Sequence, residues 1–254
     1  MCTIALMLEV VDGAPLVLAA NRDELYARPT RSPEVLLTEP RIAGGVDVLS
    51  GGTWLALRAD GQFAAVTNQR ALSMAPPGLR SRGLAVRELA ASRDPDAYVA
   101  AIDPGSYASM NLLWGNSRGI SIAYVRRDEG TVDIERLGRG VHVLCNDRLG
   151  APGFPRADRL RESIEAALVA HVGWPALSPL LAQALADHTR VEPAPSHLPP
   201  ALARELTATC IHSEIYGTRS ATIIAADGDH VIDYLHADGP PCTAAFSDRR
   251  SLLQ

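Results

Sequence analysis

The chain has 254 residues, of which 47% are hydrophobic and 21% are charged, as in an ordinary soluble globular protein. Its net charge of −5 gives no reason to expect a nucleic acid or an anionic membrane as the main partner. All 24 basic residues are arginine, which excludes a Schiff-base lysine and a P-loop lysine. Recognition of an anion must therefore use guanidinium or backbone N–H groups.

The first quarter of the chain predicts two β-hairpins. Asp12–Gly13 and Asp60–Gly61 are typical turn sequences. Each separates two apolar runs, CTIALMLEV (2–10) from PLVLAANR (15–22) and TWLALR (53–58) from FAAVTN (63–68). Strands that are apolar throughout are covered on both faces, which suggests an inner layer of a layered protein. The intervening segment RPTRSPEVLLTEP (28–40) is predicted to be a long, proline-punctuated loop.

Helices and strands alternate along the rest of the chain. A helix over about 83–101 is interrupted where Asp94–Pro95 starts a new one. Four strands are then expected, at 110–116, 120–127, 131–137 and 141–146. They are followed by an amphipathic helix that ends near His171, a helix over about 177–187, a proline-rich loop at 191–200, and strands at 219–227 and 230–238 joined by a DGD turn.

The predicted order of elements is therefore β, α, β, α, β, with most consecutive strands joined by hairpins. This order favours an α+β protein with mostly antiparallel sheets and helices grouped outside them over a doubly wound parallel sheet. We find no internal repeat and no clear domain boundary, so we expect a single domain over residues 1–254.

Four cysteines are spread along the chain without a CxxC pair: Cys2, Cys145, Cys210 and Cys242. Their spacing predicts neither a zinc site nor a disulfide framework, so we expect no bound metal. The first residues lack the basic and apolar regions of a signal peptide. No apolar run approaches the roughly 18 residues that a membrane span needs. These observations predict a cytoplasmic protein without a transmembrane segment.

Cys2 has two interpretations. Cysteine is among the most often buried residue types, so a cysteine at the start of a strand needs no chemical role. Alternatively, removal of Met1 would free an α-amine on the same residue as the thiol. That amine titrates near roughly 8, so it could accept the thiol proton and later deliver it to a leaving amine.

Polar residues follow several of the predicted strands. In NRDE (21–24), Asp23 could orient an ammonium group, Asn21 could donate to a carbonyl or oxyanion, and Arg22 could bind a carboxylate. Asn68 and Asn146 end two further strands and carry amide donors of the kind that stabilise an oxyanion. Ordinary turn roles and an Arg–Asp pair explain these residues equally well.

Seven stretches occur in a characteristic order: MCTIALML, LVLAANRDELYARPT, SGGTWLALRADGQFAAVTNQR, SRG, NLL, LCN and YGTRSATII. They resemble the landmarks of the NRDE protein family, also called the transport and Golgi organisation 2 family, over nearly the whole chain. The resemblance implies a fold of the N-terminal nucleophile hydrolase type, a four-layer αββα sandwich. Its relatives there are cysteine-nucleophile acylases such as choloylglycine hydrolases, penicillin V acylases and acid ceramidase-like amidases.

The resemblance also implies roles for five residues. Cys2 would be the nucleophile and Asp23 would hold its amine. Asn68 and Asn146 are similar in placement to the oxyanion and amine-orienting asparagines of the acylases, and Arg219 to a late arginine that completes the site. One departure is visible: the acylases carry an arginine in an RNxD order, whereas Ala20 stands at that position here. Because neighbours alternate along a strand, Arg22 is expected to point to the opposite face.

Two functions follow from these residues and from the resemblance. The first is hydrolysis of a small amide or thioester by Cys2, which requires no cofactor. The second is non-catalytic binding of haem or an acyl-CoA-like ligand in the same cleft, because the family is associated with haem trafficking and lipid metabolism. Haem needs an axial ligand, and the candidates are His212, Cys210 and Cys2, without a CxxCH motif.

On either hypothesis the partner is a small molecule, and a homo-oligomer is compatible with the sequence. The residues expected to contact the ligand are Asn21, Arg22, Trp54 and His212.

Overall fold

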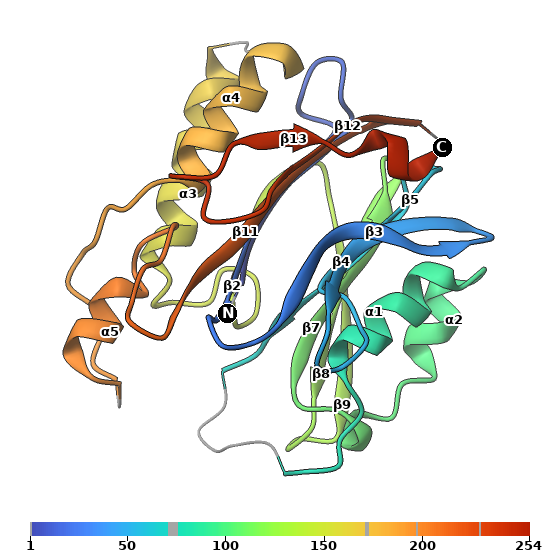
Figure 1. Ribbon diagram of the computed structural model, residues 1–254, viewed down its shortest axis with the longest axis horizontal. Coiled ribbons are helices and arrows are strands. Elements are labelled where there is room, and N and C mark those ends of the chain that lie inside the picture. Colours follow the sequence, from blue (N-terminus) through green and yellow to red (C-terminus); the bar gives the residue numbers. More distant parts are fainter. Residues whose placement is uncertain (1, 71–75, 171–172, 197, 229) are drawn as a thin grey trace.

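The computed structural model describes residues 2–70, 76–170, 173–196, 198–228 and 230–254, and it has four layers. Two antiparallel sheets stack face to face. Helices α3 (Pro155–Val169) and α4 (Trp174–Leu185) cover one sheet, and α1 (Arg82–Ala91) and α2 (Pro95–Ala100) cover the other (Figure 1). The predicted αββα sandwich is therefore confirmed.

The first sheet holds the N-terminal strand between two partners. Its strands, as far as the structure describes the chain, follow the order β10-β1-β2-β11-β12-β13, and every pair is antiparallel. Their bounds are β1 (Cys2–Leu8), β2 (Leu16–Leu25), β10 (Gly140–Leu144), β11 (Tyr216–Asp227), β12 (His230–Ala237) and β13 (Phe246–Asp248). This position explains why β1 and β2 are almost continuously apolar.

The second sheet runs in simple chain order, from β3 to β9, with antiparallel neighbours throughout. Its strands are β3 (Thr30–Thr38), β4 (Arg41–Asp47), β5 (Leu55–Arg58), β6 (Phe63–Asn68), β7 (Met110–Asn116), β8 (Gly119–Arg126) and β9 (Thr131–Leu137). Asp60–Gly61 predicted the β5–β6 hairpin, whereas α1 and α2 lie between β6 and β7.

Alternation along β1 shows how the layers divide the core. Ile4, Leu6 and Leu8 pack between the two sheets. Ala5 and Met7 point the other way, against α3 and α4. A strand has a side-chain period of two, so Cys2 belongs to the set that faces the opposite sheet.

The segment 28–40 is not the loop that its prolines suggested. Residues Thr30–Thr38 form β3, the edge strand of the second sheet, and β4 follows directly. Pro33 is tolerated because an edge strand has one side that needs no ladder hydrogen bonds. The β3–β4 register also shifts between Arg31 and Glu34, which marks an irregular edge.

Short elements account for the other differences. α5 (Pro200–Glu205) and β13 were not predicted, because elements of this length show too little periodicity to be recognised. α3 ends at Val169, before the predicted end near His171, which lies outside the described residues, as do residue 197 of the proline-rich loop and residue 229 of the DGD turn. Among the described helices, none is both long and apolar enough to cross a membrane.

The buried His236 on β12 makes stability depend on pH. Its side chain is 1% exposed, and Nδ1 lies 3.0 Å from the hydroxyl of Thr222. Burial lowers the pKa of His236 to about 4, whereas an unfolded histidine titrates near 6.5. Between these values the unfolded chain binds a proton that the folded chain does not, so stability is lost as pH falls.

We expect the free energy of unfolding to fall by about 3 kcal/mol between pH 7 and pH 4 from this group alone. Urea denaturation across this range measures it. His236→Gln should flatten the profile, and the exposed His230→Gln should leave it unchanged. Identical profiles for wild type and His236→Gln would contradict the assignment.

Candidate functional site

Three side chains from neighbouring strands form a row that faces the second sheet. Cys2 of β1 lies directly opposite Arg22 of β2, and Arg22 lies directly opposite Ser220 of β11. Residues directly opposite each other on paired strands project to the same face. Because Ile4 packs between the sheets, these three residues, here called the Cys2 row, lie on that inner face as well.

Arg22 is the charged member of the Cys2 row. Its side chain is 6% exposed, and Nη1 is buried without a hydrogen-bond partner among the described residues. Nη2 lies 4.0 Å from Oε2 of Glu24. Burial lowers the pKa of Arg22, but a guanidinium starts so high that it stays charged. Asn21 and Asp23 alternate to the other face, so it is Arg22 that shares a face with Cys2.

Trp54 from the second sheet completes this part of the site. The Arg22 guanidinium carbon lies 4.2 Å from the centroid of its ring, which is a cation–π contact. The indole fits because position 45 is glycine: a Cβ there would lie 2.2 Å from Cη2 of Trp54. Trp54 therefore packs against one side of the guanidinium, and the buried Nη1 has no hydrogen-bond partner among the described residues.

A cleft of about 280 Å³ is lined by Cys2, Arg22 and Trp54. Its wall contains an ion pair between Arg28 and Asp47, with an N···O distance of 2.6 Å. Arg82 also lines the cleft and donates from Nη1 to the backbone carbonyl of Ser109. A cleft of this size and charge suits a small molecule with a carboxylate or a polarised carbonyl oxygen.

The Cys2 thiol is protonated at neutral pH in this environment. Burial raises its pKa, and the nearby Asp23 carboxylate raises it further. Arg22 and a hydrogen bond with the Asp23 backbone act in the opposite direction. A neutral thiol needs a base before it can act as a nucleophile.

Asp23 lies behind the Cys2 row, on the face of β2 that meets the helices. It is buried and accepts a hydrogen bond of 2.7 Å from the Thr218 hydroxyl. Burial raises the pKa of Asp23, and the Arg156 guanidinium opposes that rise. The Asp23 carboxylate thus points away from the face on which the thiol lies, although Asp23 also borders the cleft that Cys2 lines.

Arg156 is a buried arginine near the site that the sequence did not predict. It lies in the first turn of α3, is 1% exposed, and donates to the carbonyl of Leu206 and, at 3.3 Å, to Oδ1 of Asn146. Burial disfavours its charge, but Cys145 and Asp23 together raise the pKa of Arg156. The helix begins with the residues PRADRL, and hydrophobic periodicity treats an arginine as a surface residue. The pattern therefore did not predict that Arg156 is buried.

Asn68 and Asn146 are brought together across the two sheets. Nδ2 of Asn146 donates to the backbone carbonyl of Asn68 at 2.8 Å, while its Oδ1 accepts from Arg156. Asn146 is buried and Asn68 lines the cleft. Asn68 therefore lines the same cleft as Cys2, and Asn146 contacts its backbone without lining the cleft.

Two predicted residues have other partners. Both N–H groups of the Asn21 amide donate to backbone carbonyls, of Leu185 at 2.8 Å and of Thr209 at 2.9 Å, so neither can donate to a ligand. Nη1 of Arg219 donates to three carbonyls, those of Leu25, Tyr26 and Arg28. A β-bulge between Thr218 and Ser220 takes Arg219 out of the ladder, so its guanidinium lies against the carbonyls that follow β2.

His212 lies in a different cluster from the Cys2 row. Its Nε2 is 3.3 Å from the sulfur of Cys242 and 3.6 Å from that of Cys210. The imidazole nitrogen therefore faces two thiols, so the predicted ligand-binding role of His212 in the Cys2 cleft does not match its surroundings.

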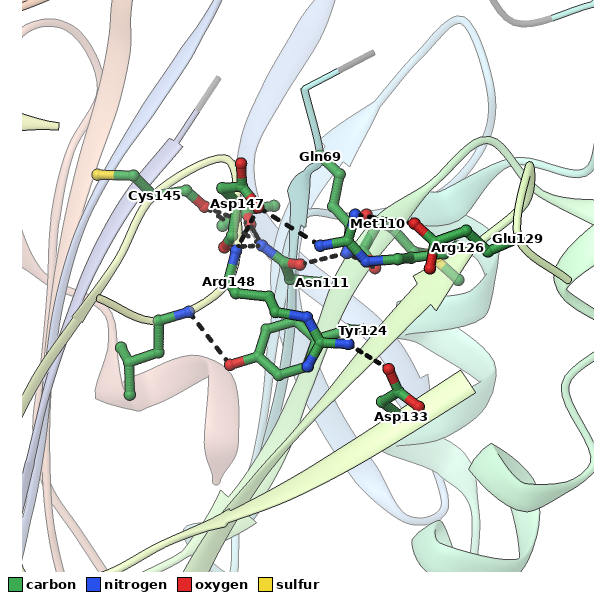
Figure 2. Close-up of polar contacts among 12 residues, drawn as sticks. Gln69, Met110, Asn111, Tyr124, Arg126, Glu129, Asp133, Cys145, Asp147 and Arg148 are labelled. Atoms are coloured by element: carbon green, nitrogen blue, oxygen red, sulfur yellow. Dashed lines mark hydrogen bonds and ion pairs between the residues drawn. The ribbon is translucent and has the colours of Figure 1, made fainter. Parts of the chain in front are cut away.

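A polar network around Asn111 joins the ends of β6, β7 and β10 (Figure 2). Nδ2 of Asn111 donates to Thr67 Oγ1 and to the Asp147 carbonyl, each at 2.9 Å. Its Oδ1 accepts from Gln69 at 2.7 Å. Asn68 lies between Thr67 and Gln69 in the sequence, and Asn146 precedes Asp147, so the network holds both asparagines in place. Asn111 belongs to the stretch NLL, which carried part of the family resemblance, but no role was predicted for its side chain.

Solved structures of the same architecture show the class of fold. Penicillin V acylase from Agrobacterium tumefaciens has a TM-score of 0.54 and 12% identity, covering 97% of this chain and 86% of that one. A mutant conjugated bile acid hydrolase from Clostridium perfringens has a TM-score of 0.58 and 9% identity, covering 100% and 94%. The chain has the fold of the N-terminal nucleophile hydrolases.

Sequence relatives identify the family within that class. The family model of Transport and Golgi organisation 2 matches residues 1–237. A transport and Golgi organization protein 2 homolog from Bos taurus is 30% identical over 235 residues, 84% of this chain and 83% of the relative. The homolog from Homo sapiens is 29% identical over 236 residues. The chain belongs to the transport and Golgi organisation 2 family.

Proposed function

We propose that the protein is a hydrolase that uses Cys2 as an N-terminal nucleophile on a small amide or thioester. The observation that best supports it is the Cys2 row, in which a thiol lies beside a buried guanidinium N–H that has no partner among the described residues. The fold adds support, because solved structures that share it are named as an acylase and a hydrolase.

The proposed reaction begins with removal of Met1, which frees the α-amine of Cys2. That amine accepts the thiol proton, and the thiolate attacks the substrate carbonyl. The carbonyl oxygen becomes an oxyanion, and Nη1 of Arg22 donates to it. Collapse of the intermediate expels an amine or thiol, which takes the proton from the α-ammonium. Water then hydrolyses the thioester on Cys2, with the same amine as base.

The first experiment tests processing and acylation together. Because these 254 residues contain no lysine, an amine-selective reagent reports on the N-terminal amine alone. We expect the intact mass to lack one methionine, and a panel of N-acyl amides and acyl thioesters to leave an acyl group on Cys2. Retention of Met1 with no acyl adduct from any member of the panel would overturn the proposal.

Two variants separate the roles in this reaction. Cys2→Ala should abolish the acyl adduct, while Ser251→Ala, at an exposed residue outside the cleft, should retain it. Arg22→Gln should lower kcat/KM by roughly 100-fold or more, as loss of an oxyanion donor does in other enzymes.

Because burial raises the pKa of Cys2, the alkylation rate of the thiol should rise with pH beyond about 8.5, where a free cysteine levels off.

Non-catalytic binding of an acyl-CoA-like anion in the same cleft is the second candidate. Arg22 and Arg82 favour it, since guanidinium groups suit phosphate and carboxylate. Saturable binding of an acyl-CoA by wild type without turnover, reduced in Arg22→Gln, would support this function over hydrolysis. Haem binding in this cleft gains no support from His212 or Cys210, because neither residue lines it.

A further inference from the structure

Four side chains with metal-binding donor atoms gather at one place outside the Cys2 cleft. His188, Cys210, His212 and Cys242 each offer one donor atom, and these atoms all lie within 4.8 Å of one another. His188 follows α4, the pair Cys210 and His212 precedes β11, and Cys242 lies between β12 and β13. The cysteine spacing predicted no metal site, because the fold assembles this cluster from three separate segments.

The distances among Cys210, His212 and Cys242 match the edges of a tetrahedral zinc site. Zn–S bonds of about 2.3 Å and Zn–N bonds of about 2.0 Å give edges of about 3.8 Å between two sulfurs and about 3.6 Å between sulfur and nitrogen. The sulfurs of Cys210 and Cys242 are 3.8 Å apart. Nε2 of His212 lies 3.6 Å and 3.3 Å from those sulfurs.

The hydrogen bonds of the cluster leave the donor atoms free for an ion. Nδ1 of His188 lies 3.0 Å from the carbonyl of Cys210, so it carries the proton and Nε2 keeps its lone pair. Ligating histidines commonly donate their other N–H to a backbone carbonyl in this way. The ring centroid of His188 lies 5.0 Å from that of His212. The backbone N–H of His212 is held at 2.8 Å by Glu205.

We propose that His188, Cys210, His212 and Cys242 bind one zinc ion in a tetrahedral Cys2His2 site. Two thiolates and two imidazoles are the donors that zinc prefers, and four protein ligands leave no open position for substrate. The site is therefore structural. It joins the chain between α4 and β11 to the connection between β12 and β13.

The zinc site adjoins the support behind the Cys2 row. His212 forms an isolated bridge with Gly217, the residue before Thr218. The backbone N–H of Ile211 donates to the Thr218 hydroxyl at 2.9 Å, and that hydroxyl donates to Asp23. Zinc would thus hold in place the segment that positions Thr218 against Asp23.

Cobalt substitution tests the site directly. The full chain is reduced, freed of metal with a chelator and titrated with Co²⁺ without oxygen. We expect one equivalent to bind with the intense visible bands of tetrahedral Co²⁺ and a thiolate charge-transfer band. One equivalent of Zn²⁺ should abolish both, since zinc binds thiolate sites more tightly. Zinc in excess should raise Tm by roughly 10 °C.

Matched variants assign the ligands. Cys242→Ser and His188→Gln should each weaken Co²⁺ binding at least about 10-fold, and Cys242→Ser should halve the charge-transfer intensity. Cys2→Ser, which leaves the cluster intact, should bind Co²⁺ like wild type. The proposal is overturned if the reduced protein binds no Co²⁺, gives only octahedral spectra, or binds equally well as Cys242→Ser. A Cys210–Cys242 disulfide whose reduced form takes up no metal would also overturn it.

Discussion

Replacement of Arg156 by leucine is expected to lower the free energy of unfolding by about 3–5 kcal/mol, the cost of leaving a buried charge without its counter-ion. The guanidinium is 1% exposed and acts on the buried Asp23 carboxylate. Its loss also removes the donors to the Leu206 carbonyl and to Asn146. Urea denaturation at neutral pH measures the change.

Arg161→Leu provides the control for this prediction. Arg161 lies on the same helix, is exposed, and forms ion pairs at 3.6 Å with Asp158 and at 3.8 Å with Glu165. Surface pairs of this kind contribute about 0–1 kcal/mol, so this variant should unfold close to wild type. Equal losses in the two variants would show that helix packing, and not the buried charge of Arg156, sets the stability.

Replacement of Asn111 by alanine is expected to lower the free energy of unfolding by about 3 kcal/mol, because several buried polar groups lose their partner at once. The Asn111 side chain is 0% exposed and bonds Thr67, Gln69 and Asp147. The variant should also slow acylation of Cys2, because Asn68 and Asn146 lose the network that holds them. Denaturant unfolding and the intact-mass assay measure the two effects.

Asn116→Ala is the matched control for Asn111→Ala. Asn116 lies at the other end of β7, where its Oδ1 accepts the backbone N–H of Arg118. We expect a loss of about 1 kcal/mol or less and normal acylation, since one neutral hydrogen bond at a turn contributes little. A smaller loss for Asn111→Ala than for Asn116→Ala would contradict the importance of the network.

Much of the fold could be predicted because its strands are long, apolar and joined by recognisable turns. β1, β2, β5 and β6 fell where Asp12–Gly13 and Asp60–Gly61 placed their hairpins. β3 was missed because Pro33 and Pro40 are typical of loops, and only the position of β3 at the sheet edge makes a proline acceptable there. Edge position is a property of the assembled sheet, so no local pattern reveals it.

The sequence could predict the candidate site only where residues close in the chain, such as those of one hairpin, fix the positions of its side chains. The expectation that Arg22 points to the opposite face was wrong: the β1–β2 register pairs it with Cys2 on one face. Arg156 and Asn111 depend on contacts between distant elements, and Arg219 depends on a bulge that adds one residue to β11. The zinc ligands come from three segments, so their spacing in sequence carries no signal.

The bulge in β11 lets positions 218 and 220 pair with β2 while position 219 makes other contacts. Thr218 still pairs with Asp23 and Ser220 with Arg22, because the extra residue between them takes no part in the ladder. Arg219 instead holds the carbonyls that lead from β2 into β3. A substitution at position 219 therefore acts on the β2–β3 connection, while substitutions at positions 218 and 220 act on the register that aligns the Cys2 row.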